Sequence, residues 1–390
     1  MPRAQAQARA RAFLPRPTHF NQRQRQRPLS TSAAGAGAGA GATAVRAPEA
    51  PVPAGLAPLP SRRLLSVAGP DAPKFLQRMV TNDLTTPGTV HYAGLLNAHG
   101  RVLHDLFIYN DLLNIGGRDQ PDPAENYLLE VDADEAKRLE KLIKFYKLKA
   151  KLDVRVLDPE QARVWQVWGG GGDESVPNGM VVRDGRAPAM GFRVLTAGQK
   201  PQVEVDEVGE EMYTLRRYLH GVAEGQREIL NGSLPLESNL DLCGGVGFRK
   251  GCYIGQELTI RTKHRGVVRK RILPCVLYGE GEERPTELAY KPTFGKGLDA
   301  GLVGAETSIQ RVAKKGRSPG KWLKGIGNVG LALCRLEIMT DVTLPGEEPG
   351  ESFQPDAEFS LVAGGDEGTP MRIKAFVPEW VRKGVSEDTH

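Results

Sequence analysis

Apolar residues recur at helical spacing where the ordered part of the chain is expected to begin. Between residues 71 and 82 they line one side of a helix: Ala72, Phe75, Leu76, Met79 and Val80. A helix with this pattern packs its apolar face on a core. We therefore predict an amphipathic helix over 71–82. Its polar end, Thr81 to Asp83, can turn toward a pocket.

The pattern then changes to that of strands. Residues 90–96 and 102–109 are predicted strands, and the polar segment 97–100 between them has the composition of a hairpin turn. Asp132 is a predicted N-cap, followed by an apolar stripe that continues the helix to about Ala150. Strands and helices mixed in this order favour an α+β fold.

The same signals predict further elements downstream. Short strands are expected at 153–157, 163–167 and 190–195, and a capped helix is expected over 206–224. The polar residues that we assign to the outer faces of this helix are Arg216, Arg217 and His220.

After residue 267 the chain carries β-rich runs separated by Gly, Pro and acidic turns, and no long amphipathic helix is predicted. The runs are 271–278, 326–339, 358–362 and 371–377. This spacing favours a separate, mostly antiparallel barrel or sandwich. Residues 311–324 combine six cations with Trp322, and we expect an exposed loop there.

The amino-terminal segment, residues 1–48, has the composition of an import peptide. It holds eight arginines and no lysine, aspartate or glutamate. An arginine-rich, acid-free segment with Ser and Thr is typical of mitochondrial targeting, so we expect residues 1–48 to be a disordered transit peptide and the protein to reside in the mitochondrial matrix. Residues 49–60 are Pro-rich and are expected to form an extended, poorly packed linker.

Charge and hydropathy narrow the classes of partner. The formal net charge is +5, but without the eight arginines of the predicted transit peptide it is −3. A broad nucleic-acid-binding surface is therefore not expected. No run of about 18 apolar residues occurs, so we do not expect membrane insertion.

The stretch 250–257, KGCYIGQE, concentrates reactive and conformationally special residues. Cys252 lies between Gly251 and Gly255, which allow close approach to the backbone. Arg249 and Lys250 precede the thiol, and nearby cations favour the thiolate, which is the form that acts as nucleophile and metal ligand. The alternative is a buried structural cysteine.

The four cysteines limit the metal chemistry. Cys243, Cys252, Cys275 and Cys334 contain no C-x-x-C pair, and their spacing fits neither ferredoxin nor zinc patterns. The chain is thus not expected to hold a stable cluster alone. An exposed thiolate at Cys252 can still share a transient iron-sulfur cluster with the cysteines of another protein.

Several segments resemble one family. The octet 250–257 matches at every position the K-G-C-Y-x-G-Q-E signature of iron-sulfur cluster assembly factors related to the glycine cleavage T-protein. TNDL at 81–84, LLNAHGRVLHDLFIY at 95–109 and LPLESNLD at 234–241 resemble the same family, so the likeness covers most of the chain after residue 60.

The resemblance implies a fold and a set of domains. It implies two α+β domains around a folate-binding cleft, followed by a carboxy-terminal antiparallel β-barrel. The first α+β domain is expected to combine residues 61–95 and 160–262, the second to be inserted at 96–159, and the barrel to span 265–384.

The resemblance also implies a role in late maturation of [4Fe-4S] proteins, with A-type scaffold proteins and [4Fe-4S] client enzymes as partners. Cys252 is then the signature thiol, and its matching neighbours are Lys250, Gly251, Tyr253, Gly255, Gln256 and Glu257. Tetrahydrofolate is the expected cofactor, with binding residues Asn82, Asp105, Glu237 and Asn239.

Three functions are compatible with these residues. The favoured one is an assembly factor whose thiol engages a cluster or its scaffold. A second is a folate-dependent aminomethyl or one-carbon transferase, in which Asp105 and Glu237 polarise the pterin. The T-protein enzymes carry an Asp-Asp pair where this chain has His104-Asp105. If their catalytic aspartate aligns with His104, this chain lacks it, which argues against transferase activity. If it aligns with Asp105, the catalytic aspartate is present. The third is a non-catalytic, scaffold-binding adaptor in which the octet is only a hinge.

Overall fold

The computed structural model describes residues 47–86, 90–119, 121–170, 176–177, 179–295, 297–312, 318–344, 353–363 and 368–387, and all of them belong to one compact unit. Its helices are α1 Ala72–Met79, α2 Ala136–Tyr146, α3 Glu210–His220, α4 Gln256–Arg265, α5 Leu336–Met339 and α6 Glu379–Glu387, with 3-10 turns η1 Ala133–Glu135 and η2 Ala300–Leu302. The predicted transit peptide, apart from residues 47 and 48, lies outside the described residues.

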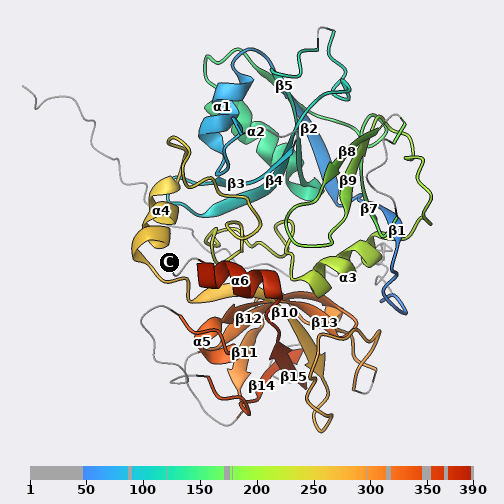
Figure 1. Cartoon of the computed structure of the whole chain (residues 1–390), viewed down its shortest axis with the longest axis vertical. Coiled ribbons are helices and arrows are strands. Elements are labelled where there is room, and N and C mark those ends of the chain that lie inside the picture. Colours follow the sequence, from blue (N-terminus) through green and yellow to red (C-terminus); the bar gives the residue numbers. More distant parts are fainter. Residues whose placement is uncertain are drawn as a thin grey trace, which may run out of the picture. The chain divides into compact units, whose positions relative to one another are not determined.

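Strands build two sheets and a closed barrel (Figure 1). The five-stranded sheet has the order β3 (Val90–Leu96), β4 (Val102–Asn110), β5 (Asn126–Asp132), β2 (Arg62–Ala68) and β6 (Asp153–Val156). The four-stranded sheet has the order β1 (Gly55–Pro58), β7 (Arg163–Trp168), β9 (Phe192–Thr196) and β8 (Gly179–Arg183). Neighbouring strands are antiparallel throughout both sheets.

The predicted α1 helix and the β3–β4 hairpin are confirmed. Ala72, Leu76 and Met79 of α1 are buried in a core that also contains apolar residues of β2 and β5. The hairpin turn closes through the Asn97 carbonyl, which accepts from Gly100, and through Gly100 itself, whose φ of 76° lies in the left-handed region. The hydrophobic pattern thus determined both elements correctly.

The predicted boundary between the two α+β domains does not follow the sheets. Segments 61–95 and 96–159 were expected in different domains, but β2 and β3 of the first share one sheet with β4, β5 and β6 of the second. The connection is β5, which pairs with β4 on one side and β2 on the other. We did not predict β5 because all but its last residue are buried, so its sequence NYLLEVD lacks a polar alternation.

The predicted linker 49–60 is also wrong in part. Residues 55–58 form β1, which pairs with β7, and Leu56 and Ala57 are fully buried. Leu56 also exchanges backbone hydrogen bonds with the segment before α3, donating to Asp206 and accepting from Val208. Proline at the end of a short edge strand does not interrupt the ladder, which is why a Pro-rich segment can pack here.

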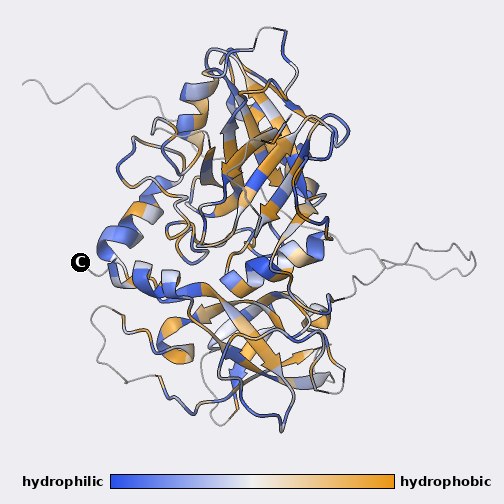
Figure 2. Ribbon diagram, turned by 45° about the vertical axis from the view of Figure 1, so that its right-hand side comes forward, coloured by the Kyte–Doolittle hydropathy of each residue, from blue (hydrophilic) through white to orange (hydrophobic). Residues whose placement is uncertain are grey.

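The carboxy-terminal strands form the predicted antiparallel barrel. Around its circumference the order is β10 (Lys270–Tyr278), β13 (Val329–Arg335), β12 (Gly320–Ile326), β11 (Ser308–Arg311), β14 (Phe359–Ala363) and β15 (Thr369–Ala375). Figure 2 shows that these strands carry much of the apolar sequence of this part of the chain. Val381 and Val385 of α6, a helix that we did not predict, pack on the barrel core.

The prediction of an exposed loop over 311–324 needs correction. Residues 320–324 belong to β12, and Trp322 is fully buried inside the barrel. Residues 313–317 of this segment lie outside the described residues. The alternation of Lys321 outside and Trp322 inside is that of a strand, and the clustered lysines obscured it in the sequence.

Candidate functional site

Cys252 lies on the loop that enters α4, and its side chain is exposed. The other three cysteines are buried, Cys243 in the main core and the remaining two, Cys275 and Cys334, inside the barrel. The prediction that this thiol faces solvent is therefore confirmed, and the alternative of a buried structural cysteine is wrong for position 252.

Lys250 attaches this loop to α1. Its Nζ donates to three backbone carbonyls, at 2.7 Å from Gln77, 2.8 Å from Val80 and 2.6 Å from Asn82. These carbonyls lie at the end of α1 and just beyond it, where helix carbonyls lack intrahelical partners. The three donors of the ammonium are thus all used. Lys250 therefore acts as a cap that joins the loop to α1. Its effect on the Cys252 thiol stays a prediction.

The electrostatic surroundings of Lys250 agree with a half-buried cation. Burial lowers the pKa of Lys250 to about 8, while Asp83 opposes that shift. The ammonium also lies 5.2 Å from the centre of the Tyr253 ring. One further hydrogen bond, from Ile254 N to the Arg78 carbonyl at 3.1 Å, attaches the loop to α1.

The two glycines of the octet differ in what they do. Gly255 has a φ of 78° and is the N-cap of α4, and a Cβ at this position would lie 2.3 Å from the Asn97 carbonyl oxygen in the hairpin turn. Gly255 is therefore required by both conformation and packing. A Cβ added at Gly251 would meet no atom within 4 Å, and the φ of Gly251 is not positive, so the fold itself does not require glycine there. Close approach of a partner at Gly251 stays a prediction.

The remaining octet residues shape the entry to α4. Gln256 accepts from Tyr253 N through its side-chain oxygen at 3.2 Å, and Glu257 is exposed in the first turn of α4. Tyr253 is buried and anchors the loop in the main core. Cys252 is thus the exposed point of a loop that its neighbours hold in place.

The residues predicted for tetrahydrofolate do not converge on one described cavity. Asn82 donates to the carbonyls of Tyr92 and Gly244, both at 2.8 Å, and Asn239 donates to the Ile272 carbonyl at 2.7 Å. Both amides are thus used by the fold. In the described part of the chain, Glu237 lines two cavities, whereas Asn82, Asp105 and Asn239 line none of the cavities that we describe.

The larger of these two cavities has a volume of about 410 Å³ and lies between the segment 228–238 and the barrel. Glu237 shares it with Lys270, whose Nζ lies 3.8 Å from the Glu237 carboxylate, and with Arg335. The four residues do not share one of the cavities described here, so we derive no chemical step through folate, and its binding stays a prediction.

Asp105 faces the inside of the molecule. Its side chain is fully buried on β4, accepts from Gly225 N at 3.1 Å and lies 3.7 Å from the Arg62 guanidinium. Burial raises the pKa of Asp105, and the Arg62 charge opposes that rise. A carboxylate with no exposed surface is poorly placed to meet a substrate without rearrangement.

The neighbouring His104 lies on the opposite face of β4 and is fully buried. Burial lowers the pKa of His104 to about 4, and Arg138 adds to the shift. Neither ring nitrogen has a hydrogen-bond partner among the described residues. The imidazole is therefore neutral in the folded protein at physiological pH.

We expect His104 to make stability depend on pH. From pH 6.5 down to about 4 the unfolded chain binds a proton that the folded chain does not, so the free energy of unfolding falls by up to about 3 kcal/mol as the pH falls. His104→Leu, which cannot titrate, should flatten this part of the profile in urea unfolding measured between pH 7 and 4. An equally steep profile in the variant would contradict the assignment.

A buried ion network near Asp105 was missed in the sequence. It joins β2, β4, β5, β9 and α3 and consists of four arginines and five acids: Arg62, Arg186, Arg193, Arg217, Asp105, Glu130, Asp184, Glu224 and Glu228. We had assigned Arg217 to a solvated helix face, but its guanidinium is buried and lies 2.6 Å from Glu228. The available signal was the presence of opposite charges inside apolar strand runs, such as Glu130 in NYLLEVD.

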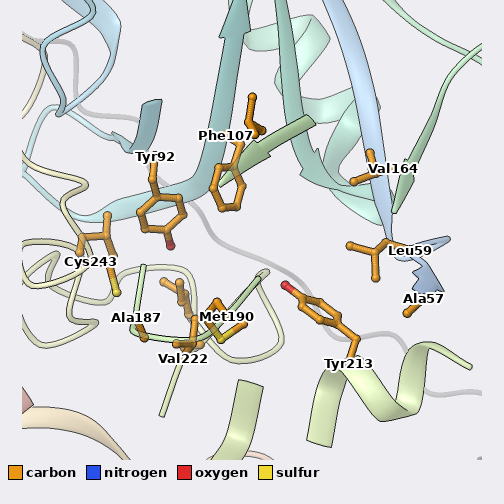
Figure 3. Packing of buried hydrophobic residues seen from close by; sticks show 14 of the residues in the cluster. Ala57, Leu59, Tyr92, Phe107, Val164, Ala187, Met190, Tyr213, Val222 and Cys243 are labelled. Carbon is orange, nitrogen blue, oxygen red and sulfur yellow. The ribbon is translucent and has the colours of Figure 1, made fainter. Parts of the chain in front are cut away.

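Aromatic rings enclose this network. Figure 3 shows Tyr92 and Phe107 extending from the five-stranded sheet, with Tyr213 reaching toward the same region from α3. The Arg186 guanidinium lies 4.7 Å and that of Arg193 4.9 Å from the Phe107 ring centre. Such stacking offsets part of the cost of burying a guanidinium. The network and these rings therefore form one buried polar cluster.

The fold defines a class of protein. One family model, "GCVT N-terminal domain", matches residues 4–112, and another, "CAF17, C-terminal beta-barrel domain", matches residues 269–383. The structure is similar to the crystal structure of glycine cleavage system aminomethyltransferase T from Bartonella henselae, with a TM-score of 0.57 at 15% identity, covering 86% of this chain and 87% of that chain. The chain thus has the T-protein-like fold with a carboxy-terminal barrel.

Its relatives are more specific. The mitochondrial iron-sulfur cluster assembly factor IBA57 homolog of Pyricularia oryzae is 53% identical over 349 residues, covering 86% of this chain and 87% of the relative. The homolog of Chaetomium globosum is 49% identical over 381 residues, covering 87% and 86%. The chain belongs to this family of mitochondrial iron-sulfur cluster assembly factors. Its location is mitochondrial, as we predicted.

Proposed function

We propose that this protein acts in the mitochondrial matrix in late iron-sulfur cluster assembly, in the maturation of [4Fe-4S] proteins. In this proposal Cys252 supplies a thiolate to a cluster that a partner protein carries. The cluster is cargo, and it passes from the partner to a client enzyme. The family to which the chain belongs supports the general role, and the octet supports the role of the thiol.

The exposure of Cys252 on an anchored loop carries the proposal. Iron-sulfur clusters are commonly held by four thiolates, whereas Cys252 is exposed and the other three cysteines are buried. A cluster at Cys252 therefore needs further ligands from another protein. Lys250 and Gly255 hold the loop against α1 and the hairpin turn, so the sulfur is presented at a fixed place.

A-type scaffold proteins are the proposed cluster carriers, and [4Fe-4S] enzymes are the proposed clients. Both are expectations from the resemblance of the octet. Among the described residues no helix is long and apolar enough to cross a bilayer.

Tetrahydrofolate remains a prediction from the same resemblance. Glu237, which lines a cavity, is the residue of the predicted set that is placed to meet a ligand.

The buried position of Asp105 disfavours the transferase alternative, so we do not put it forward as a second function. The adaptor alternative differs from our proposal in leaving Cys252 without a role.

Anaerobic titration with a cluster-loaded A-type scaffold tests the proposal. The wild-type protein should change the visible absorbance of the cluster as Cys252 replaces one of its ligands, and Cys252→Ser should abolish that change. Cys243→Ala, which removes a buried thiol, is the matched control and should behave as the wild type. The same absorbance change in wild type and Cys252→Ser would contradict the proposal and favour the alternative function as a scaffold-binding adaptor.

A further inference from the structure

An exposed apolar and cationic surface lies on α1 and α2 and is not used by the fold. We call it the α1–α2 face and define it by three apolar and three cationic residues: Phe145, Tyr146, Leu148, Lys74, Arg78 and Lys149. Neither the octet nor the buried network includes any of these residues.

The apolar part is more exposed than folding requires. Phe145 is 73% and Leu148 84% exposed, the two highest values among the large apolar residues of the described chain, and Tyr146 between them is 42% exposed. Large apolar side chains that gather on a surface mark interaction sites, whereas scattered ones do not.

Leu148 adds a second, independent observation. Its φ of 46° lies in the left-handed region just after α2 ends, where Gly or Asn is the usual residue. Leucine there costs conformational energy and buries little surface in return. Contacts within the folded chain therefore do not explain why a leucine stands at this position.

The cationic part surrounds these residues. Residues 137–151 hold seven lysines and arginines against one acid, Glu140. Lys144 pairs with Glu140, and Arg138 pairs with Glu135. Lys74, Arg78 and Lys149 form no ion pair with any residue that the structure describes. The face is thus strongly positive on a protein whose predicted mature part carries a net negative charge.

A groove of about 460 Å³ runs between α1 and α2 along this face. Phe75, Met79 and Tyr146 form apolar parts of its wall, and Lys74 and Arg78 also line it. Ile254 of the octet lines the same groove. Since Ile254 is two residues from Cys252, their Cα atoms are at most about 7 Å apart. Whatever occupies the groove therefore touches the loop that carries the exposed thiol.

We propose that the α1–α2 face is the docking surface for the cluster-carrying partner, an acidic protein that places an apolar side chain in the groove. This inference rests on the proposed function and adds the surface that brings the cluster to Cys252. Charge complementarity would steer the encounter, and Phe145 and Leu148 would be the apolar anchors. Flat anionic membranes have no side chain to fill a groove, whereas a folded protein partner can supply one.

The test measures the Kd of the full chain for an A-type scaffold by calorimetry at low and high salt. The double variant Phe145→Ser with Leu148→Ser should raise the Kd at least about tenfold. The charge-reversal variant Lys74→Glu with Lys149→Glu should raise it most at low salt. Leu302→Ser with Val312→Ser, which alters two exposed apolar residues of the barrel, is the matched control and should leave the Kd unchanged. The midpoint of thermal unfolding checks that each variant folds.

Several outcomes would overturn the proposal. A scaffold Kd that is unchanged in both variants of the face, or no binding by the wild type, excludes docking here. Loss of binding to cardiolipin-containing vesicles or to a single-stranded oligonucleotide, with the scaffold Kd unchanged, assigns the face to another partner. Cys252→Ser separates the two proposals: if it takes up cluster like the wild type while the face variants lose affinity, the role of the thiol fails and the docking surface stands.

Discussion

Glu224→Ala is expected to lower the free energy of unfolding by about 3–5 kcal/mol, the usual cost of removing one partner from a buried ion pair. The Glu224 carboxylate lies 2.8 Å from Arg186 and 2.5 Å from Arg193, and it also accepts from the Tyr213 hydroxyl at 2.7 Å. Burial would raise the pKa of Glu224, but the two arginines outweigh it and hold the pKa well below its usual range.

The physical reason is that two guanidinium groups would stay buried with less opposite charge. Arg193 would keep Glu130 at 3.0 Å, and Arg186 would keep Asp184 at 2.7 Å, so the network would be weakened and not emptied. Whole domains are stable by about 5–15 kcal/mol, so this loss is a large fraction of the total. Urea unfolding of wild type and variant measures it.

Asp341→Ala is the matched control for Glu224→Ala. Asp341 pairs with Arg382 at 2.8 Å, a similar distance, but both side chains are exposed. Water already solvates exposed pairs, so this variant should lose at most about 1 kcal/mol. Equal losses in the two variants would show that burial of the network does not matter to stability.

Lys250→Met is expected to release the loop that carries Cys252. The variant keeps the length of the side chain but leaves three carbonyls without their charged donor. Hydrogen bonds to charged groups contribute about 1.5–3 kcal/mol each, so the three together amount to about 4.5–9 kcal/mol. Because Lys250 is half-buried and water can solvate part of the freed carbonyls, we expect a loss of about 3–5 kcal/mol. The effect on cluster absorbance should weaken at least about tenfold. Amide hydrogen exchange in residues 250–255 should accelerate.

Arg249→Met distinguishes the cap from an electrostatic role. Arg249 is the exposed neighbouring cation, so its removal changes the charge near Cys252 without touching the cap. If cations activate the thiol, both variants should slow alkylation of Cys252 by iodoacetamide. If Lys250 is a cap, Arg249→Met should leave the exchange rates unchanged, and Lys250→Met should not slow alkylation. Equally slow alkylation in both variants would support the prediction that the two cations activate the thiol.

Elements with a clear period could be predicted from sequence, and buried ones could not. The helix at α1 and the hairpin at β3 and β4 followed from spacing and turn chemistry. The strand β5 is buried on both faces and therefore has no alternation to detect. Missing it produced the wrong domain boundary, because β5 is the strand that joins the two predicted domains into one sheet.

The candidate site shows the same division. Local composition identified Cys252 and the need for Gly255, because a thiol and a left-handed glycine are properties of single positions. The role of Lys250 depends on carbonyls about 170 residues away in the chain, and the sequence does not show that these groups lie close together in space.

Periodicity, turn residues and a signature octet are local properties, and they were sufficient to predict the mixed fold, the barrel and an accessible cysteine. Which strands share a sheet, which partner each buried charge has, and which groove borders the loop of Cys252 follow only from the folded chain. Those depend on contacts between segments far apart in the chain, whose free energies are set by burial and by opposite charges that only folding brings together.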